Sequence, residues 1–140
     1  MKPALTILVV DDSEPMRAIL ATILTSRGHA VVLADSVSAA KDALMAQRPD
    51  LILTDYNMPG GKGSELVRWI RAHAVFDHAP IFVVSSEQDP RLHLRMAQAG
   101  ASLWISKPVC IGSLLSAVDA VAGQHYLLSP DNFETRARAV

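Results

Sequence analysis

Short apolar segments alternate with longer segments of helical periodicity over most of the chain. Runs rich in β-branched residues are typical of strands, whereas apolar residues that recur every three or four positions are typical of one face of a helix. Strands are expected at residues 6–10, 30–34, 50–55, 80–85 and 101–106. Helices are expected between Ser13 and Gly28 and at about 38–47, 63–73, 89–99 and 111–121. The alternation predicts an α/β protein with five βα units and a parallel sheet.

The first apolar run, at residues 6–10, is apolar on both faces of the predicted strand. A strand in the centre of a parallel sheet is covered by helices on both sides, so this pattern favours a central position. Asp11 and Asp12 end the run, and the Ser13 side chain can cap the helix that follows.

Length and composition indicate one folded domain without a charged binding surface. The chain has 140 residues, of which 50% are hydrophobic and 19% are charged. A chain of this length buries roughly two-thirds of its unfolded surface, which supports a core without metal or disulfide. The net charge is −1 and there is no run of Lys and Arg. The sequence therefore gives no electrostatic signal for binding nucleic acid or a membrane surface.

The last part of the chain loses the helical pattern. The periodicity lapses after Ala122, and a polar stretch follows to the end. We expect one domain over residues 1–122 and a C-terminal extension over residues 123–140, with no second domain. Tyr126, Leu127 and Leu128 favour docking of this extension onto the domain.

Cysteine content and the N-terminus both suit a cytoplasmic protein. Cys110 is the only cysteine, so no intramolecular disulfide can form, and we expect it to be a small buried apolar residue. The apolar run at residues 4–10 is too short to span a membrane and lacks a cleavage site of small residues.

Polar residues whose side chains can bind ligands or react lie at the ends of four predicted strands. In an open α/β sheet, ligands bind at the carboxyl ends of the strands, so these residues are expected to face one pocket. They are Asp11 and Asp12 after the first strand, Asp55 at the end of the third, Ser85 and Ser86 after the fourth, and Lys107 after the fifth.

Three carboxylates in one pocket raise one another's pKa unless a cation neutralises them. Hard oxygen ligands suit Mg²⁺, and the absence of histidine from these strand ends argues against zinc. Lys107 can hold a phosphoryl oxygen, or pair with Asp55 when no phosphoryl group is bound. A carboxylate can accept a phosphoryl group as an aspartyl phosphate, and Asp55, alone on its strand, is the expected acceptor.

These motifs resemble the receiver domain of two-component response regulators. The residues that carry the resemblance are Asp11-Asp12, Asp55-Tyr56-Asn57-Met58-Pro59, Ser85-Ser86 and Lys107-Pro108. They occur in the family's order and cover about residues 4–122 of the chain. The resemblance implies a flavodoxin-like, doubly wound (βα)₅ fold with strand order 2-1-3-4-5. It also suggests the stand-alone, chemotaxis-type form, because no output domain is expected after residue 122.

The resemblance further implies a role for each site residue. Asp55 would take a phosphoryl group from a phosphohistidine on a histidine kinase or a phosphotransfer protein. Asp11, Asp12, Asp55 and the backbone carbonyl of Asn57 would bind Mg²⁺. Ser85, Ser86 and Lys107 would contact the phosphoryl group.

The family also implies a switch and an output surface. Ser85 and the aromatic residue on the fifth strand, here Trp104, match the switch positions, although Tyr or Phe is usual in place of Trp. Phosphorylation would change a surface formed by the fourth helix, fifth strand and fifth helix, where a downstream protein binds. Asn57 and Glu87, two positions after Asp55 and Ser85, would border the phosphoryl group and tune its lifetime.

Several other interpretations stay open at this point. A phosphorelay shuttle is a close variant, and formation of a homodimer is left open. A phosphatase that forms an aspartyl phosphate would need Asp-x-Asp after the first strand, where this chain has Asp11-Asp12-Ser13. A nucleotide-binding module would need a Gly-rich turn there, and residues 60–64 lack the phosphate-loop spacing and are expected to form a flexible loop. We expect a signalling domain that assists its own phosphorylation and dephosphorylation rather than an enzyme.

The histidines show no spacing typical of metal ligands. Solvated or helix-capping positions are expected for all of them, namely His29, His73, His78, His93 and His125.

Overall fold

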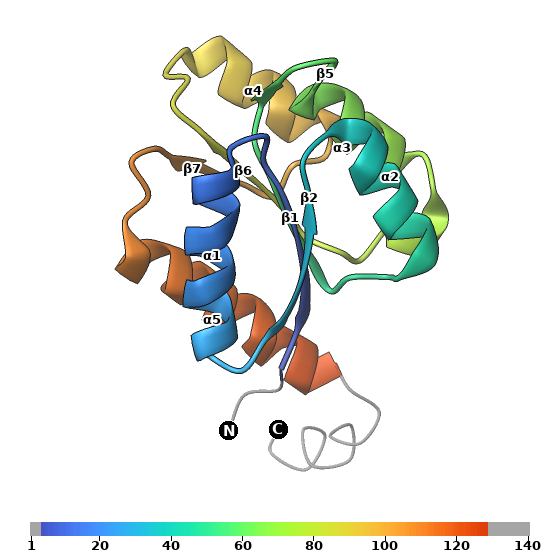
Figure 1. Ribbon diagram of the computed structural model, residues 1–140. Helices are drawn as coiled ribbons and strands as arrows, with labels where there is room; N and C mark the ends of the chain where they lie inside the picture. The colour runs from blue at the N-terminus through green and yellow to red at the C-terminus, as the bar shows by residue number, and fades with distance from the viewer. Residues whose placement is uncertain (1–3, 129–140) are drawn as a thin grey trace.

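The computed structural model describes residues 4–128 and shows one parallel sheet between two layers of helices (Figure 1). Its five strands lie in the order β2-β1-β3-β6-β7, which confirms the predicted order 2-1-3-4-5. The strands are β1 (Thr6–Val10), β2 (Ala30–Ala34), β3 (Leu51–Thr54), β6 (Ile81–Ser85) and β7 (Leu103–Ser106). The order of strands reverses next to β1, and the paired strands β1 and β3 are interior strands whose carboxyl ends lie side by side.

One α-helix follows each strand of the parallel sheet, as the sequence pattern predicts. The helices are α1 (Glu14–Ser26), α2 (Val37–Ala46), α3 (Gly63–Arg71), α4 (Pro90–Ala99) and α5 (Ile111–Leu128), with a short 3₁₀ helix, η1 (Ala74–Phe76), after α3. Figure 1 shows α1 and α5 on one face of the sheet and α2 and α3 on the other. Doubly wound sheets place helices on both faces because each parallel crossover is right-handed.

Alternate residues of each strand enter two separate hydrophobic cores. Leu8 and Val10 of β1 pack into the core beneath α2, α3 and α4, together with Leu44, Leu66 and Met96 of those helices. Ile7 and Val9 pack into the other core, with Leu20 and Leu24 of α1 and Leu114 and Val118 of α5. Successive strand side chains point to opposite faces, so a strand covered on both sides must be apolar throughout.

Local signals fix the helix ends close to their predicted positions. The Ser13 hydroxyl accepts a hydrogen bond from the Met16 backbone N–H, at 3.3 Å, and caps α1. Asp89 caps α4, and Gly100 ends this helix in the left-handed conformation, with φ of 119°. A side chain at Gly100 would also overlap that of Arg71. These caps set where each helix starts beyond the sheet edge.

The segment predicted as a flexible loop contains a small hairpin. Strands β4 (Asn57–Met58) and β5 (Gly61–Lys62) pair antiparallel around Pro59 and Gly60. Proline fixes the first central position of this turn, and Gly60 supplies the positive φ, 81°, that the second position requires. Gly63 then lets the start of α3 pass against the backbone oxygen of Asp55, where a Cβ would not fit. The hairpin therefore holds the chain just after Asp55.

Three other expectations differ from the structure. Helix α5 continues to Leu128 instead of lapsing after Ala122. Cys110 is exposed, not buried. His29 is buried and accepts a hydrogen bond from the Leu5 backbone N–H, so its expected solvated or capping position is wrong.

The predicted docking of the Tyr126, Leu127 and Leu128 side chains lies outside the described residues, and the division at residue 122 stays a prediction. Within residues 4–128, no helix is both long enough and apolar enough to cross a membrane.

Candidate functional site

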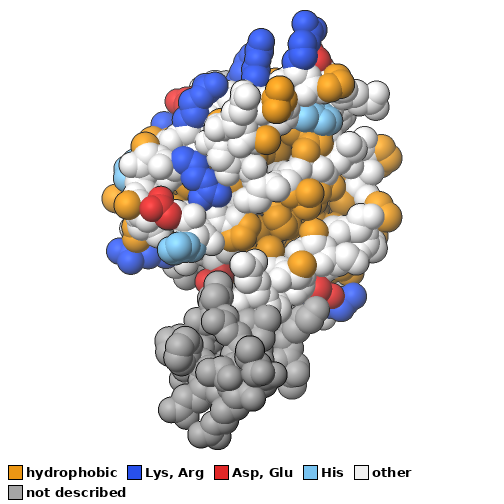
Figure 2. Space-filling model, turned by 180° about the vertical axis from the view of Figure 1, so that it is seen from behind, with side chains coloured by type: hydrophobic (Ala, Val, Ile, Leu, Met, Phe, Trp, Pro, Cys, Tyr) orange, Lys and Arg blue, Asp and Glu red, His pale blue; other side chains and the backbone are white. Residues whose placement is uncertain are grey.

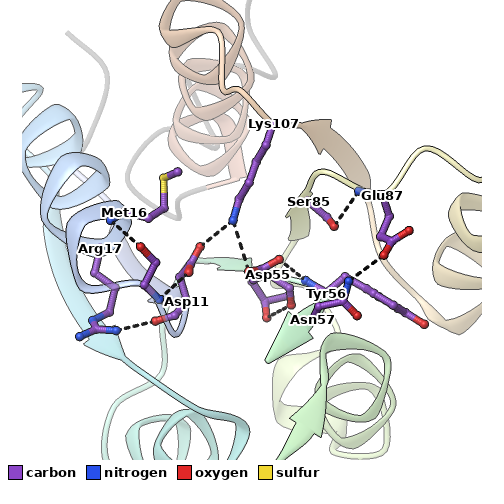
Figure 3. A network of polar contacts seen from close by, with 11 residues as sticks. Asp11, Met16, Arg17, Asp55, Tyr56, Asn57, Ser85, Glu87 and Lys107 are labelled. Carbon is purple, nitrogen blue, oxygen red and sulfur yellow. Dashed lines mark hydrogen bonds and ion pairs between the residues drawn. The ribbon is translucent and has the colours of Figure 1, made fainter. Parts of the chain in front are cut away.

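The carboxyl ends of β1, β3, β6 and β7 bring together the side chains predicted to form the site (Figure 3). Asp11 follows β1, Asp55 follows β3, Ser85 ends β6, and Lys107 follows β7. The strands are in register at this edge, where Val10 pairs with Thr54 and Ser85 with Ser106. Residues from four distant parts of the sequence thus meet because parallel strands all end at the same edge.

Asp11 is almost fully buried, with 2% of its surface exposed. One carboxylate oxygen accepts the Ser13 backbone N–H at 2.9 Å, and the other lies 3.1 Å from the Lys107 ammonium. Its backbone carbonyl accepts a hydrogen bond from the Arg17 guanidinium at 2.7 Å. The turn into α1 therefore fixes this carboxylate in one orientation.

Asp55 is also buried, and its two oxygens have different partners. Oδ1 accepts the backbone N–H of Tyr56 at 2.7 Å, and Oδ2 lies 3.2 Å from the Lys107 ammonium. Burial raises the pKa of the Asp55 carboxyl above its usual value, and the charge of Asp11 acts in the same direction. The Lys107 charge opposes both effects on this pKa.

Lys107 is the cation that holds the two buried carboxylates together. Burial acts to lower the pKa of its ammonium, but the hydrogen bonds and charges of Asp11 and Asp55 outweigh burial and raise it. Lys107 therefore stays protonated at neutral pH. One ammonium faces two buried carboxylates, so the pocket carries an excess of negative charge.

Asp12 adds a third carboxylate at the exposed rim. Oxygen atoms of Asp11, Asp12 and Asp55 all lie within 4.8 Å of one another. Carboxylate oxygens are hard ligands that suit Mg²⁺, which also retains waters and takes phosphate oxygens. The donor set and the uncompensated negative charge therefore fit a divalent cation of this kind.

A second group of polar residues borders Asp55 on the side of β6. The Asn57 amide donates to the Glu87 carboxylate at 2.9 Å, and the Glu87 backbone N–H donates to the Ser85 hydroxyl at 3.2 Å. Figure 3 shows the Ser85 hydroxyl pointing toward the Glu87 backbone. Ser85 is buried, whereas Ser86, predicted with it, is exposed. The structure thus brings Asn57 and Glu87 into direct contact at the rim.

Trp104 lies on β7 between two other rings. Its ring centroid is 4.0 Å from that of His93, nearly parallel to it, and 6.2 Å from that of Tyr56. The indole Nε1 is buried and has no hydrogen-bond partner. A buried donor without a partner costs about 1–3 kcal/mol, so this ring is not in its best polar environment.

Most of this chain is similar to known proteins of one family. The family model of the response regulator receiver domain matches residues 7–119 of this chain. The phosphate regulon transcriptional regulatory protein PhoB of Pseudomonas aeruginosa is 30% identical over 83% of this chain and 51% of its own length. The chain thus spans about half the length of this curated relative.

Two solved structures show the same fold over nearly their whole length. The chemotaxis response regulator CheY4 of Vibrio cholerae is 28% identical, with a TM-score of 0.80 over 85% of this chain and 99% of its own. A response regulator receiver protein from Pseudomonas putida is 34% identical, with a TM-score of 0.79 over 86% and 99% of the two chains. The fold and the strand-end pocket define an α/β signalling domain of the two-component type. The chain belongs to the response regulator receiver domain family.

The family assignment confirms the resemblance drawn from the strand-end motifs. Receiver domains are phosphoacceptor signalling domains, which take phosphoryl groups from histidine kinases, bind downstream partners and bind Mg²⁺ at the acidic pocket. In this chain, the Asp11, Asp12 and Asp55 cluster could hold such an ion.

Some contacts of the site had no counterpart in the sequence analysis. Lys107 pairs with Asp11 as closely as with Asp55, and Arg17 binds the Asp11 backbone. The position of Arg17, one turn into α1, was the only available signal for its contact. The stacking of His93 on Trp104 had no sequence signal, because the two residues lie on different elements.

Proposed function

We propose that this protein is a phosphoacceptor that carries a transient phosphoryl group on Asp55 and thereby changes how it binds a partner protein. The observation that carries the proposal is the shared Lys107 ammonium, 3.1 Å from Asp11 and 3.2 Å from Asp55 beside the exposed Asp12. Three carboxylates and one ammonium form a pocket suited to a metal ion and a phosphoryl group.

In the proposed reaction, the donor is a phosphohistidine on a histidine kinase or a phosphotransfer protein. A carboxylate oxygen of Asp55 forms a bond to phosphorus while the bond between phosphorus and the donor imidazole nitrogen breaks. The bonding electron pair leaves with the imidazole, which takes a proton. Asp11, Asp12, Asp55 and the Asn57 backbone carbonyl would hold Mg²⁺, which would neutralise charge on the phosphoryl oxygens.

The neighbouring side chains orient the group before and after transfer. Lys107 already lies 3.2 Å from Asp55 Oδ2 and can donate to a phosphoryl oxygen without a large movement. Ser85 ends β6 and Ser86 follows it, and the Ser85 hydroxyl, which accepts the Glu87 N–H, can turn and donate to the same group. Phosphorylation adds about −1.5 to −2 charges at neutral pH, which is enough to reorganise these contacts.

The surface that reads the change is proposed to comprise α4, β7 and α5. Strand β7 is an edge strand, with a cavity of about 220 Å³ on its α4 side and one of about 390 Å³ on its α5 side. Figure 2, seen from behind, shows hydrophobic side chains gathered in the middle of that face of the molecule. Ser85 and Trp104 would be the switch residues that connect this surface to Asp55.

Mass spectrometry of the intact protein tests the proposed function. Incubation with Mg²⁺ and acetyl phosphate is expected to add one phosphoryl group to the wild type and none to Asp55→Asn. Asp35→Asn, which changes an exposed aspartate between β2 and α2, should be labelled like the wild type. Labelling of Asp55→Asn would refute the proposal, and multiple turnover of a small phosphomonoester would favour the phosphatase alternative.

The lifetime of the phosphoryl group provides a finer prediction. The contact of 2.9 Å between Asn57 and Glu87 lies beside Asp55, where it can limit the access of the hydrolytic water. Asn57→Ala and Glu87→Ala are each expected to change the dephosphorylation rate by about 3- to 10-fold, equivalent to about 1 kcal/mol, without preventing labelling. Loss of the labelled form after removal of the phosphodonor measures this rate. Gln88→Ala, at an exposed neighbour, should leave the rate unchanged.

A further inference from the structure

Glu87 connects the pocket to α4 through three different atoms. Its backbone N–H donates to the Ser85 hydroxyl at 3.2 Å, and its carboxylate accepts from the Asn57 amide at 2.9 Å. Its backbone carbonyl lies 3.1 Å from Nε2 of His93 on α4. A carbonyl oxygen only accepts, so Nε2 of His93 carries the proton in this contact. A movement of the Glu87 backbone therefore changes its hydrogen bond to His93.

His93 continues this connection to the edge strand. Its ring stacks on the Trp104 indole with a centroid distance of 4.0 Å and an interplanar angle of 28°. The same two residues line the cavity of about 220 Å³ between α4 and β7. The buried Trp104 indole N–H has no hydrogen-bond partner, so a ring position that gave it one would be favoured. The cavity beside the ring leaves space for such a movement.

Under the proposed function, the Ser85 hydroxyl turns toward the phosphoryl group on Asp55. In the present structure it is turned to the Glu87 N–H, and its side chain is buried. The hydroxyl oxygen occupies one rotamer at a time, so turning toward a group on Asp55 takes it away from Glu87. The segment between β6 and α4 then loses the contact that fixes its first residues.

We infer that His93 is a positioning residue that couples the Ser85–Glu87 contact to the Trp104 ring through its hydrogen bond to Glu87 and its stacking on the indole. When Ser85 releases Glu87, the His93 ring moves with the Glu87 carbonyl and uncovers one face of Trp104. The response to phosphorylation rests on the proposed function, but the coupling itself can be tested without a phosphoryl group.

The chain contains a matched control for this coupling. Its two tryptophans each contact a histidine ring, since the centroid distance between Trp69 and His73 is 4.2 Å. His73 Nδ1 contacts the backbone oxygen of Trp69 itself, at 2.7 Å, and thus closes a contact within the same segment. The pair on α3 has the same chemistry as His93 and Trp104 but is not linked to Glu87.

Tryptophan fluorescence with acrylamide quenching measures the exposure of each indole. In Trp69→Phe, where Trp104 is the only tryptophan, Mg²⁺ with beryllofluoride as a phosphoryl analogue is expected to shift the emission to the red and increase quenching. In Trp104→Phe, the emission of Trp69 should not respond. The added His93→Phe substitution keeps a stacked ring but removes the donor to Glu87, and should reduce the Trp104 response by about half or more.

A second arm contains no phosphoryl group or analogue. Ser85→Ala in the Trp69→Phe protein removes the acceptor of the Glu87 N–H and should expose Trp104 by itself. Adding His93→Phe should suppress this effect, whereas His93→Gln, which can still donate to Glu87, should expose Trp104 before any ligand is added because the stacked ring is gone. Folding of each variant is checked by far-UV circular dichroism.

The outcomes separate the two proposals. If acetyl phosphate does not label Asp55 but Ser85→Ala exposes Trp104 in a manner that depends on His93, the proposed function fails and the coupling stands. If labelling occurs and Trp104 responds equally with His93 or Phe at position 93, the coupling is refuted. The signal would then reach the indole by another contact, such as that with Tyr56.

Discussion

The two ends of the sheet both contain buried or partly buried polar side chains, but these side chains have different partners. At the amino end, His29 accepts the Leu5 N–H, Asp50 accepts the Thr6 N–H, and Arg71 donates to two backbone carbonyls. At the carboxyl end, Asp11 and Asp55 each accept one backbone N–H, but their second oxygens share the Lys107 ammonium. Polar groups that bind the backbone are held by the fold, whereas charges that bind one another can exchange partners with a ligand.

Because of this contrast, the free energy of unfolding of substituted proteins can show which end of the sheet is functional. Removing a side chain that satisfies buried backbone groups leaves those groups unpaired and destabilises the fold. Neutralising a carboxylate within an overcharged pocket relieves repulsion and is expected to stabilise it. The two ends should therefore respond to substitution with opposite signs.

The largest effect is expected at Arg71 in the amino-end group. Its guanidinium donates to the Gly100 and Phe76 carbonyls at 3.0 and 2.9 Å, so Arg71→Leu removes both bonds, although the Phe76 carbonyl keeps the Ala79 N–H. We expect a loss of about 3 kcal/mol in the free energy of unfolding, measured with urea. Arg68→Leu, at an exposed position on the same helix, should change it by less than about 0.5 kcal/mol. Equal costs for the two variants would contradict the comparison.

A smaller destabilisation is expected for His29, with a defined pH dependence. His29→Leu removes the acceptor of the buried Leu5 N–H and should cost about 1–2 kcal/mol at pH 7.5. Burial lowers the pKa of His29 below its ordinary value of 6.5; Asp119 opposes this shift and Arg27 adds to it. The stability that neutral His29 gives is thus present above pH 6.5 and is lost as the pH falls through the lowered pKa.

Urea unfolding between pH 7.5 and 5 checks this behaviour. The difference in stability between the wild type and His29→Leu should shrink as the pH falls, because a protonated imidazole cannot accept the Leu5 N–H. His78→Leu, which replaces an exposed histidine at the same end of the sheet, is the matched control substitution. A constant difference would mean that the Leu5 contact does not depend on neutral His29.

The carboxyl end could be predicted from sequence more fully than the amino end. Asp11, Asp55, Ser85 and Lys107 each directly follow or end a strongly apolar strand, and the strand order then fixes their neighbourhood. His29 instead follows a helix and has no pattern around it that reveals its contact with Leu5, which lies 24 positions away. Sequence periodicity places elements, but it does not show which backbone group a single side chain will meet.

The remaining differences have similar local causes. Gly123 interrupts the apolar pattern of α5, yet a glycine within a helix costs only about 1 kcal/mol and does not end it. The hairpin at residues 57–62 contains only two residues in each strand, too few for a periodic signal. Its one available signal was the Pro59-Gly60 pair, which is typical of a turn with a positive φ at the glycine.

The smallest effect, and the one with the opposite sign, is expected for Asp55→Asn. Burial, with the charge of Asp11, raises the pKa of Asp55 above its ordinary value of 3.8, and Lys107 only partly opposes this. Stability from protonated Asp55 is therefore present at low pH and is lost as the pH rises through the raised pKa, so ionised Asp55 destabilises the fold at neutral pH. Asparagine keeps the shape and removes the charge, and we expect a gain of about 1 kcal/mol in Mg²⁺-free buffer at pH 7.5.

Mg²⁺ should reverse the order of stability of the wild type and Asp55→Asn, because the cation, like the substitution, relieves the repulsion between the carboxylates. At about 100 times its dissociation constant, a ligand that binds only the folded state stabilises it by about 2.7 kcal/mol, so the wild type should become the more stable protein. Asp55→Asn lacks one of the three carboxylates and should gain less. Urea unfolding of both proteins with and without Mg²⁺ measures this crossover, and Asp35→Asn should follow the wild type. If Asp55→Asn lowered the free energy of unfolding in both buffers, the Asp55 carboxylate would stabilise the fold as the amino-end side chains do. The contrast between the two ends would then be wrong.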